Sequence, residues 1–169
     1  MKKVFMIAFD SKTLEFFEQT LSPAFFDLGW AVTLEKPGPN GFDFEQKRLY
    51  HCVQAADLVI VPVESPGAVH EYEVLTAALA RAYRKLLALY LAEPDSVKSI
   101  GSRKAKFSGA YSMAASFCFG VPQQDTVRYK ECFPSHIEFV IVQPRQWVSI
   151  GPTLARMLDN LITIFLKES

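Results

Sequence analysis

The chain has 169 residues, of which 50% are apolar, 13% aromatic and 21% charged. This composition excludes a disordered or low-complexity chain, and the length predicts a single domain over residues 1–169. The 18 basic and 18 acidic residues cancel, so the broad basic surface of a nonspecific nucleic-acid binder is not expected.

The lengths of the apolar runs and the spacing of the cysteines indicate in which cellular compartment the protein is expected. The longest apolar runs fall well short of the roughly 20 residues that span a bilayer, and the first one stops at Asp10, too short for a secretory signal. The three cysteines, Cys52, Cys118 and Cys132, form no CxxC pair, so we expect buried thiols and neither a disulfide framework nor a zinc site. These features predict a cytoplasmic protein with no membrane contact, no metal and no cofactor.

Strands and helices alternate in the first half of the chain. Short apolar runs predict strands at Val4–Phe9, Trp30–Leu34, Asp57–Val63 and Leu86–Ala92. Helical spacing and capping residues predict helices over Lys12–Leu28 with a break near Pro23, over Phe44–Ala56, and from His70 to about Arg84.

The second half is less regular. After a polar, basic loop, the apolar stretch Phe107–Phe119 is expected to be a helix, and His136–Val142 is expected to be a fifth strand. Pro152 suits the first position of a last helix that runs to Lys167. Repeated β–α units predict an α/β fold of three layers, in which a five-stranded, mostly parallel sheet has the flavodoxin-like order 2-1-3-4-5.

In such a sheet, ligands bind outside the carboxyl ends of the strands, where the strand order reverses. The loop after the first strand, Phe9–Thr13, contains no glycine, so neither GxGxxG nor a P-loop is present. This argues against a dinucleotide enzyme or an ATPase. Asp10 and Ser11 either bind a ligand at the helix N-terminus or form a plain N-cap.

The loop after the third strand puts a carboxylate in the first turn of the following helix. Two glutamates compete for the site, Glu71 and Glu73. On a helical wheel, one side collects Val74, Leu75, Ala78 and Ala82, and Glu71 falls on that side, while Glu73 points nearly opposite. We therefore expect Glu71 to face inward, either as a functional group or as a hydrogen-bonded cap. His70, beside it, is an acid, a base or a cap.

The loop after the fourth strand is basic. Four of its nine residues from Lys98 to Lys106 are positively charged, among them Arg103 and Lys104. Beside a sheet's carboxyl edge such a cluster suits a phosphate, although a solvated surface loop has the same composition.

The stretch from Phe44 to Tyr90 resembles the nucleoside 2-deoxyribosyltransferase superfamily, which includes nucleoside 5'-monophosphate N-glycosidases. The shared elements are Ala56-Asp57 at a helix end, an apolar strand, a Pro/Gly loop, and Gly67-x-x-x-Glu71 opening an alanine-rich helix. The resemblance implies a glutamate nucleophile that attacks the anomeric carbon of the sugar and displaces the base. Water or another base then resolves the glycosyl-enzyme, as in retaining glycosidases.

The resemblance, together with the chemistry of the three loops, suggests roles for individual residues. The spacing from Gly67 favours Glu71 as the nucleophile, whereas counting from Asp57 favours Glu73; we take Glu71 first. Asp10 is the candidate for a second carboxylate. The expected substrate-binding residues are Ser11, Gly67, His70, Arg103 and Lys104, and the expected partners are a small nucleoside or nucleotide and a second copy in a homodimer.

Two positions depart from the family pattern. Leu49 and Phe5 stand where the family carries Asp and Tyr. The alternative function is therefore a non-catalytic nucleotide-binding or interaction protein on the same fold. A third hypothesis is a flavodoxin-like flavin binder, for which the sequence has no Gly/Ser/Thr-rich phosphate loop.

Overall fold

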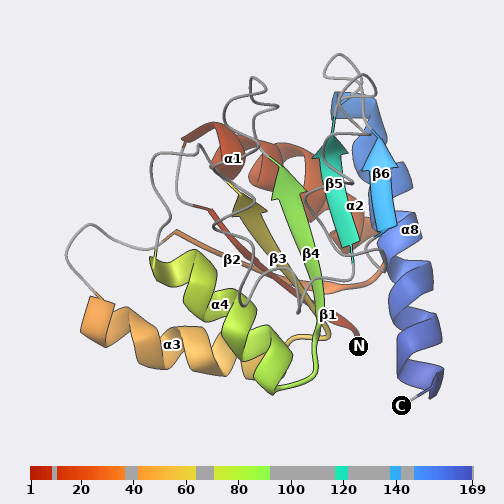
Figure 1. Ribbon diagram of the computed structural model, residues 1–169. Coiled ribbons are helices and arrows are strands. Elements are labelled where there is room, and N and C mark those ends of the chain that lie inside the picture. Colours follow the sequence, from red (N-terminus) through yellow and green to blue (C-terminus); the bar gives the residue numbers. More distant parts are fainter. Residues whose placement is uncertain are drawn as a thin grey trace.

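A computed structural model describes residues 1–8, 11–36, 42–63, 71–91, 117–121, 138–141 and 147–168 (Figure 1). In these ranges the chain forms an α/β fold around a sheet of six strands in the order β2-β1-β3-β4-β5-β6. The strands are β1 (Lys3–Ile7), β2 (Ala31–Glu35), β3 (Leu58–Val63), β4 (Leu86–Leu91), β5 (Phe117–Val121) and β6 (Glu138–Ile141). Every neighbouring pair is parallel, which confirms the predicted α/β class with a parallel sheet.

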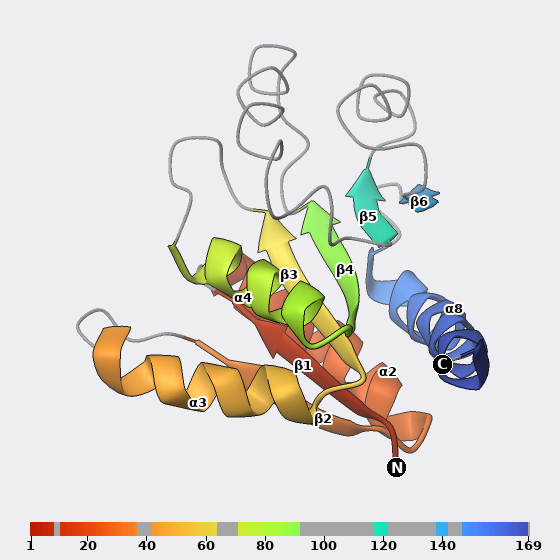
Figure 2. The ribbon, with the colours of Figure 1, turned by 60° about the horizontal axis from the view of Figure 1, so that its bottom comes forward.

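Helices cover both faces of this sheet (Figures 1 and 2). The helical elements are α1 (Ser11–Phe16), the π-helical η1 (Phe17–Leu21), α2 (Ser22–Asp27), α3 (Phe42–Ala55), α4 (Glu71–Ala82) and α8 (Trp147–Glu168). The helices α3 and α4 lie side by side on one face, and the continuous helix α1–η1–α2 lies with α8 on the other.

The central strands are apolar along their whole length because both of their faces are buried. In β1, Val4 and Met6 join the core beneath α1–η1–α2 and α8, together with residues such as Leu158 of α8. Strand alternation turns Phe5 and Ile7 to the opposite face, and each is only 1% exposed. This two-sided burial produces the uninterrupted apolar runs from which the strands are predicted.

The strand count differs from the predicted five. The first four strands have the predicted order 2-1-3-4, and the segment expected as the fifth strand is β6, at the sheet edge. Between β4 and β6 lies β5, which occupies the end of the segment predicted as a helix, Phe107–Phe119. Its sequence FCFGV is short, aromatic and apolar. Periodicity cannot distinguish such a run from a piece of buried helix, and pairing with β4 decides it.

Two helix features also differ from the prediction. The helix from Ser11 to Asp27 continues through Pro23, which lies directly after the π-helical turn and within this continuous helix. The irregularity lies earlier, in the π-helical turn Phe17–Leu21. The last helix begins at Trp147, so Pro152 lies inside α8 and not at its first position. Because only about one turn precedes this proline, it removes little of the hydrogen-bond ladder.

A half-buried polar cluster ties α8 to the amino end of the sheet. The Lys2 ammonium donates hydrogen bonds of 2.7 Å to Oδ1 of Asp159 and to Oγ1 of Thr163. The indole N–H of Trp30 donates to the same Asp159 oxygen, also at 2.7 Å. One carboxylate of α8 thus joins the residue before β1 to the residue before β2.

The α8 helix also makes a close backbone contact with η1. A Cβ placed on Gly151 would lie 2.7 Å from Thr20 Cγ2 and 2.8 Å from the Thr20 carbonyl oxygen. Since one of these atoms belongs to the backbone, a side chain at this position requires one helix to shift. Glycine at position 151 therefore sets how closely α8 approaches the π-helical turn.

We expect Gly151→Ala to destabilise the fold by about 1–3 kcal/mol, the usual cost of overpacking a tight contact. Chemical denaturation measured by circular dichroism tests this. The matched control is Asn160→Ala, an exposed position of the same helix, which should change stability by less than about 0.5 kcal/mol. Equal stability of Gly151→Ala and the parent chain would contradict the close contact.

The Asp159 cluster predicts a pH dependence. Burial by itself raises the pKa of Asp159, but the hydrogen bonds from Lys2 and Trp30 and the Lys2 charge outweigh burial and hold the pKa below its usual value. A lowered folded-state pKa gives stability that is present above the unfolded pKa of about 3.9 and is lost as the pH falls through the folded value.

We therefore expect Asp159→Asn to cost about 1 kcal/mol at pH 7, a modest figure because the cluster is partly exposed. The difference between variant and parent should shrink as the pH falls below about 4. Urea denaturation of both chains at pH 7 and pH 3 measures it. A difference that is the same at both pH values would show that the carboxylate charge does not stabilise the fold.

Candidate functional site

The strand order reverses between β1 and β3, which are paired neighbours in the sheet. The chain leaves β1 through α1–η1–α2 on one face and returns to β2, and it leaves β3 through α4 on the other face and continues to β4. In parallel α/β sheets, ligands bind at such a reversal, outside the carboxyl ends of the strands. Both α1 (labelled in Figure 1) and α4 (Figure 2) begin at this edge.

Three of the predicted site residues belong to the described part of the chain. Ser11 is the first residue of α1 and is exposed, and Glu71 and Glu73 lie in the first turn of α4. The sheet thus brings Ser11 and the start of α4 to the carboxyl ends of neighbouring strands. The other predicted residues, Asp10, Gly67, His70, Arg103 and Lys104, lie outside the described residues.

The buried row of α4 is not the one predicted. Thr76, Ala77 and Ala80 are fully buried. In the row expected to face inward, Ala82 is exposed and Ala78 is only half-buried. The reason is that this helix is rich in alanine, so apolar residues occupy both sides and their pattern does not fix which side meets the sheet.

Helical spacing relates the positions of the two glutamates, 71 and 73, to the observed buried row of α4. Residues three, four and seven positions apart share one face of a helix. By that spacing, position 73 falls in the row of Thr76, Ala77 and Ala80, which is buried. Position 71 falls in the row of Ala78. The helical phase favours Glu71 on the sequence, and the choice between Glu71 and Glu73 stays a prediction, because the observed buried row begins at Thr76.

Aromatic side chains at the end of α1 and the start of η1 pack on the carboxyl half of the sheet. Tyr90, 3% exposed, stacks on Phe16 with ring centroids 5.0 Å apart, and Phe17 contacts it at 5.5 Å. Thr13, in the first turn, is 1% exposed. Phe16 and Phe17 thus anchor the end of α1 and the start of η1 on the sheet, and Thr13 is buried two residues after Ser11.

Asp57, part of the Ala-Asp pair in the family resemblance, lies at the opposite end of the sheet. Its Oδ2 accepts a 2.8 Å hydrogen bond from the Lys3 N–H, and its own N–H donates to the Lys3 carbonyl at 2.8 Å. Asp57 thereby fixes the pairing of β1 with β3 at their amino ends. Its role in the described structure is to position strands.

The two residues that depart from the family pattern both belong to the core. Phe5 of β1 is 1% exposed and Leu49 of α3 is 4% exposed. A carboxylate at position 49 would need a partner, because burying an unpaired charge is costly. At these two positions the chain uses packing where the resembled family has polar groups.

Cys52 does not suit a nucleophilic role. The thiol is half-buried on α3, and burial raises its pKa, with a further increase from the nearby Glu35 carboxylate. The Arg48 guanidinium, which is ion-paired with Glu35, opposes these effects without cancelling them. The thiol therefore stays protonated near neutral pH, and the reactive thiolate is scarce.

The described residues offer neither a metal site nor a membrane-spanning helix. They contain no group of three or more His, Cys, Asp or Glu side chains that could hold a metal ion. None of the helices in the described ranges has the combined length and apolarity needed to cross a membrane.

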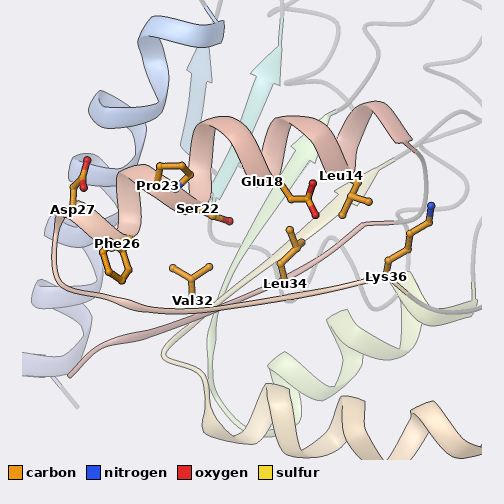
Figure 3. Close-up of a pocket in the computed structure, with 9 residues that line it drawn as sticks. All are labelled: Leu14, Glu18, Ser22, Pro23, Phe26, Asp27, Val32, Leu34 and Lys36. Atoms are coloured by element: carbon orange, nitrogen blue, oxygen red, sulfur yellow. The ribbon is translucent and has the colours of Figure 1, made fainter.

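The described residues also line a groove away from the predicted site, which the sequence did not predict (Figure 3). It is a groove of about 630 Å³ between α1–η1–α2 and β2, and so it lies at the sheet edge and not at the strand reversal. Its lining residues are Leu14, Glu18, Ser22, Pro23, Phe26, Asp27, Val32, Leu34 and Lys36. The sequence does hold a sign of this groove: Val32 and Leu34 lie two positions apart in a strand, so both apolar side chains point to the same face.

No protein-family model matches the sequence, and a search of curated proteins finds no match. Among solved structures, a CMP N-glycosidase from Clostridium botulinum is similar, with 16% identity, a TM-score of 0.47, and coverage of 94% of this chain and 99% of that one. A flavodoxin-like domain from a Synechococcus protein has 15% identity and a TM-score of 0.48, with the same coverage. At these values neither likeness assigns a function to this chain.

Proposed function

We propose that the protein is an enzyme that cleaves or transfers at the N-glycosidic bond of a nucleoside or nucleotide, through a glutamate in the first turn of α4. The observation that carries the proposal is that this turn begins at the carboxyl end of β3, beside the strand reversal. The sequence resemblance over Phe44–Tyr90 supports the role of nucleophile for a glutamate at that position.

Of the two glutamates, Glu73 is the proposed nucleophile. It shares the helical row of Thr76, Ala77 and Ala80, the buried row of α4. A residue at the start of that row is suited to reach over the strand ends, where a sugar would bind. Glu71 belongs to the other row of the same turn and serves as a matched control.

The proposed reaction has two steps. A carboxylate oxygen of Glu73 bonds to the anomeric carbon while the bond from that carbon to the base nitrogen breaks. The base leaves with the electron pair and takes up a proton. Water, or the nitrogen of a second base, then displaces the carboxylate and completes hydrolysis or transfer.

Release of free base from nucleoside 5'-monophosphates and 2'-deoxynucleosides, followed by chromatography, tests the proposal. We expect Glu73→Gln to lower the rate about a thousandfold or more, as removal of a nucleophile does, and Glu71→Gln to stay within about fivefold of the parent. The reverse pattern would make Glu71 the nucleophile. No free base from any of these substrates would overturn the enzymatic function.

A second candidate function is nucleotide binding without turnover. It is favoured by the burial of Phe5 and Leu49, because core packing occupies two positions that are polar in the resembled family. This candidate predicts that a nucleoside 5'-monophosphate raises the melting temperature while no base is released. At a hundredfold excess over Kd, the stabilisation would be about 2.7 kcal/mol. A melting temperature that no nucleotide changes would count against it.

A further inference from the structure

The outer edge of β2 has backbone groups directed away from the sheet. The Ala31 N–H donates to the Lys2 carbonyl, and the Ala8 N–H donates to the Glu35 carbonyl, both at 2.9 Å. Residues 31 and 35 thus turn their backbone groups toward β1. Because backbone direction alternates along a strand, Val32 and Leu34 turn their N–H and C=O groups outward. In the described sheet β2 is a terminal strand.

The groove of Figure 3 runs along this edge. The side chains of Val32 and Leu34 form one wall, and Leu14 and Phe26 from the helix contribute to the other. Phe26 is 74% exposed, a large apolar side chain left in water. In the same groove, the Oγ of Ser22 is buried with no hydrogen-bond partner among the described residues. An open strand edge and an apolar surface therefore lie side by side.

We propose that a second copy of this chain pairs with β2 in antiparallel orientation, across a twofold axis at Thr33. Val32 then lies opposite Leu34 of the partner copy, and Leu34 opposite Val32 of the partner copy. Both residues have outward-facing backbone groups, so each pair exchanges two hydrogen bonds. Thr33 meets its own counterpart as a non-hydrogen-bonded pair, so the register is self-consistent. This proposal is independent of the proposed function.

Charge complementarity favours a second copy over an unrelated strand. Asp27 and Lys36 lie at opposite ends of the groove (Figure 3). Neither forms an ion pair within the part of the chain that the structure describes. In the proposed register, Lys36 lies opposite Trp30 of the partner copy, close in sequence to that copy's Asp27. A twofold axis therefore brings each lysine to the other copy's aspartate.

This arrangement also accounts for the lysine at the end of an edge strand. Lysine in that position ordinarily opposes edge-to-edge pairing. Here the pairing itself supplies the opposite charge. Since a twofold axis normal to the sheet keeps both α1–η1–α2 helices on one face, the exposed Phe26 of each copy lies on the same face as the partner's groove.

Light scattering after size exclusion tests the association. We expect a mass of about 38 kDa, twice the 19.0 kDa of one chain. Asp27→Lys and Lys36→Asp should each weaken the dimer about tenfold, because each replaces two attractive contacts by two repulsive ones. The double variant restores opposite charges and should return to within about threefold of the parent. The exposed controls Glu15→Lys and Lys47→Asp should not change the dimer.

A cysteine cross-link tests the register. In a non-hydrogen-bonded antiparallel pair the Cα atoms are about 4.5 Å apart, within the range of a disulfide. Thr33→Cys, at an exposed position, should therefore give a disulfide-linked dimer on incubation with oxidised glutathione. Arg81→Cys and the parent chain, which retains Cys52, Cys118 and Cys132, should give none under the same conditions.

The outcomes separate clearly. A dimer that cross-links through Thr33→Cys and recovers in the charge-swapped double variant supports the interface. A chain that stays monomeric at about 100 μM overturns it. A dimer that neither cross-links at position 33 nor responds to charge reversal also overturns it, because the copies then meet through another surface.

Discussion

The architecture depends on burying both faces of the central strands. In β1, Phe5 and Met6 are adjacent in sequence, point to opposite faces and are each at most 1% exposed. Burying a side chain of this size contributes about 1.5–3 kcal/mol, so both faces need a helical cover. Parallel strands with helices on both faces require the chain to change direction once between neighbouring strands, here between β1 and β3. Because both faces of the central strands are buried, polar and charged side chains that react with a ligand are expected at the edges of the sheet and not within the strands.

The helical cover is held in place by contacts at both ends of the sheet. At the amino end, the Asp159 carboxylate of α8 accepts hydrogen bonds from Lys2 and Trp30. At the carboxyl end, Phe16, the last residue of α1, stacks on Tyr90 of β4. The close contact of Gly151 with Thr20 sets the distance between α8 and the π-helical turn. These contacts order the elements around the carboxyl edge without occupying it.

The proposed catalytic site and the proposed dimer interface lie at two different edges of the sheet. The carboxyl edge receives the first turn of α4, where a glutamate would act on an N-glycosidic bond. The lateral edge of β2 receives a second copy of the chain. The sequence resemblance to deoxyribosyltransferases lies in the Pro/Gly motif and the helix that follow β3, whereas Phe5 and Leu49, which differ from that pattern, belong to the core. The catalytic and the non-catalytic proposals differ only in whether the carboxylate at the start of α4 suffices without those polar groups.

The sequence by itself determined the first four strands and their order, and it predicted a candidate site at the reversal between β1 and β3. A continuous apolar run indicates a strand that is buried on both faces. The reversal between β1 and β3 then follows from the strand order 2-1-3-4. Only the tertiary structure decided three other features. It assigned Phe117–Val121 to a strand, because pairing with β4 outweighs an ambiguous apolar run. It began α8 five residues before Pro152, because a proline near the start of a helix costs little. It turned Thr76, Ala77 and Ala80 inward, a different row of α4 from the one the apolar pattern predicted. An alanine-rich helix has two apolar sides, and only packing against the sheet selects between them.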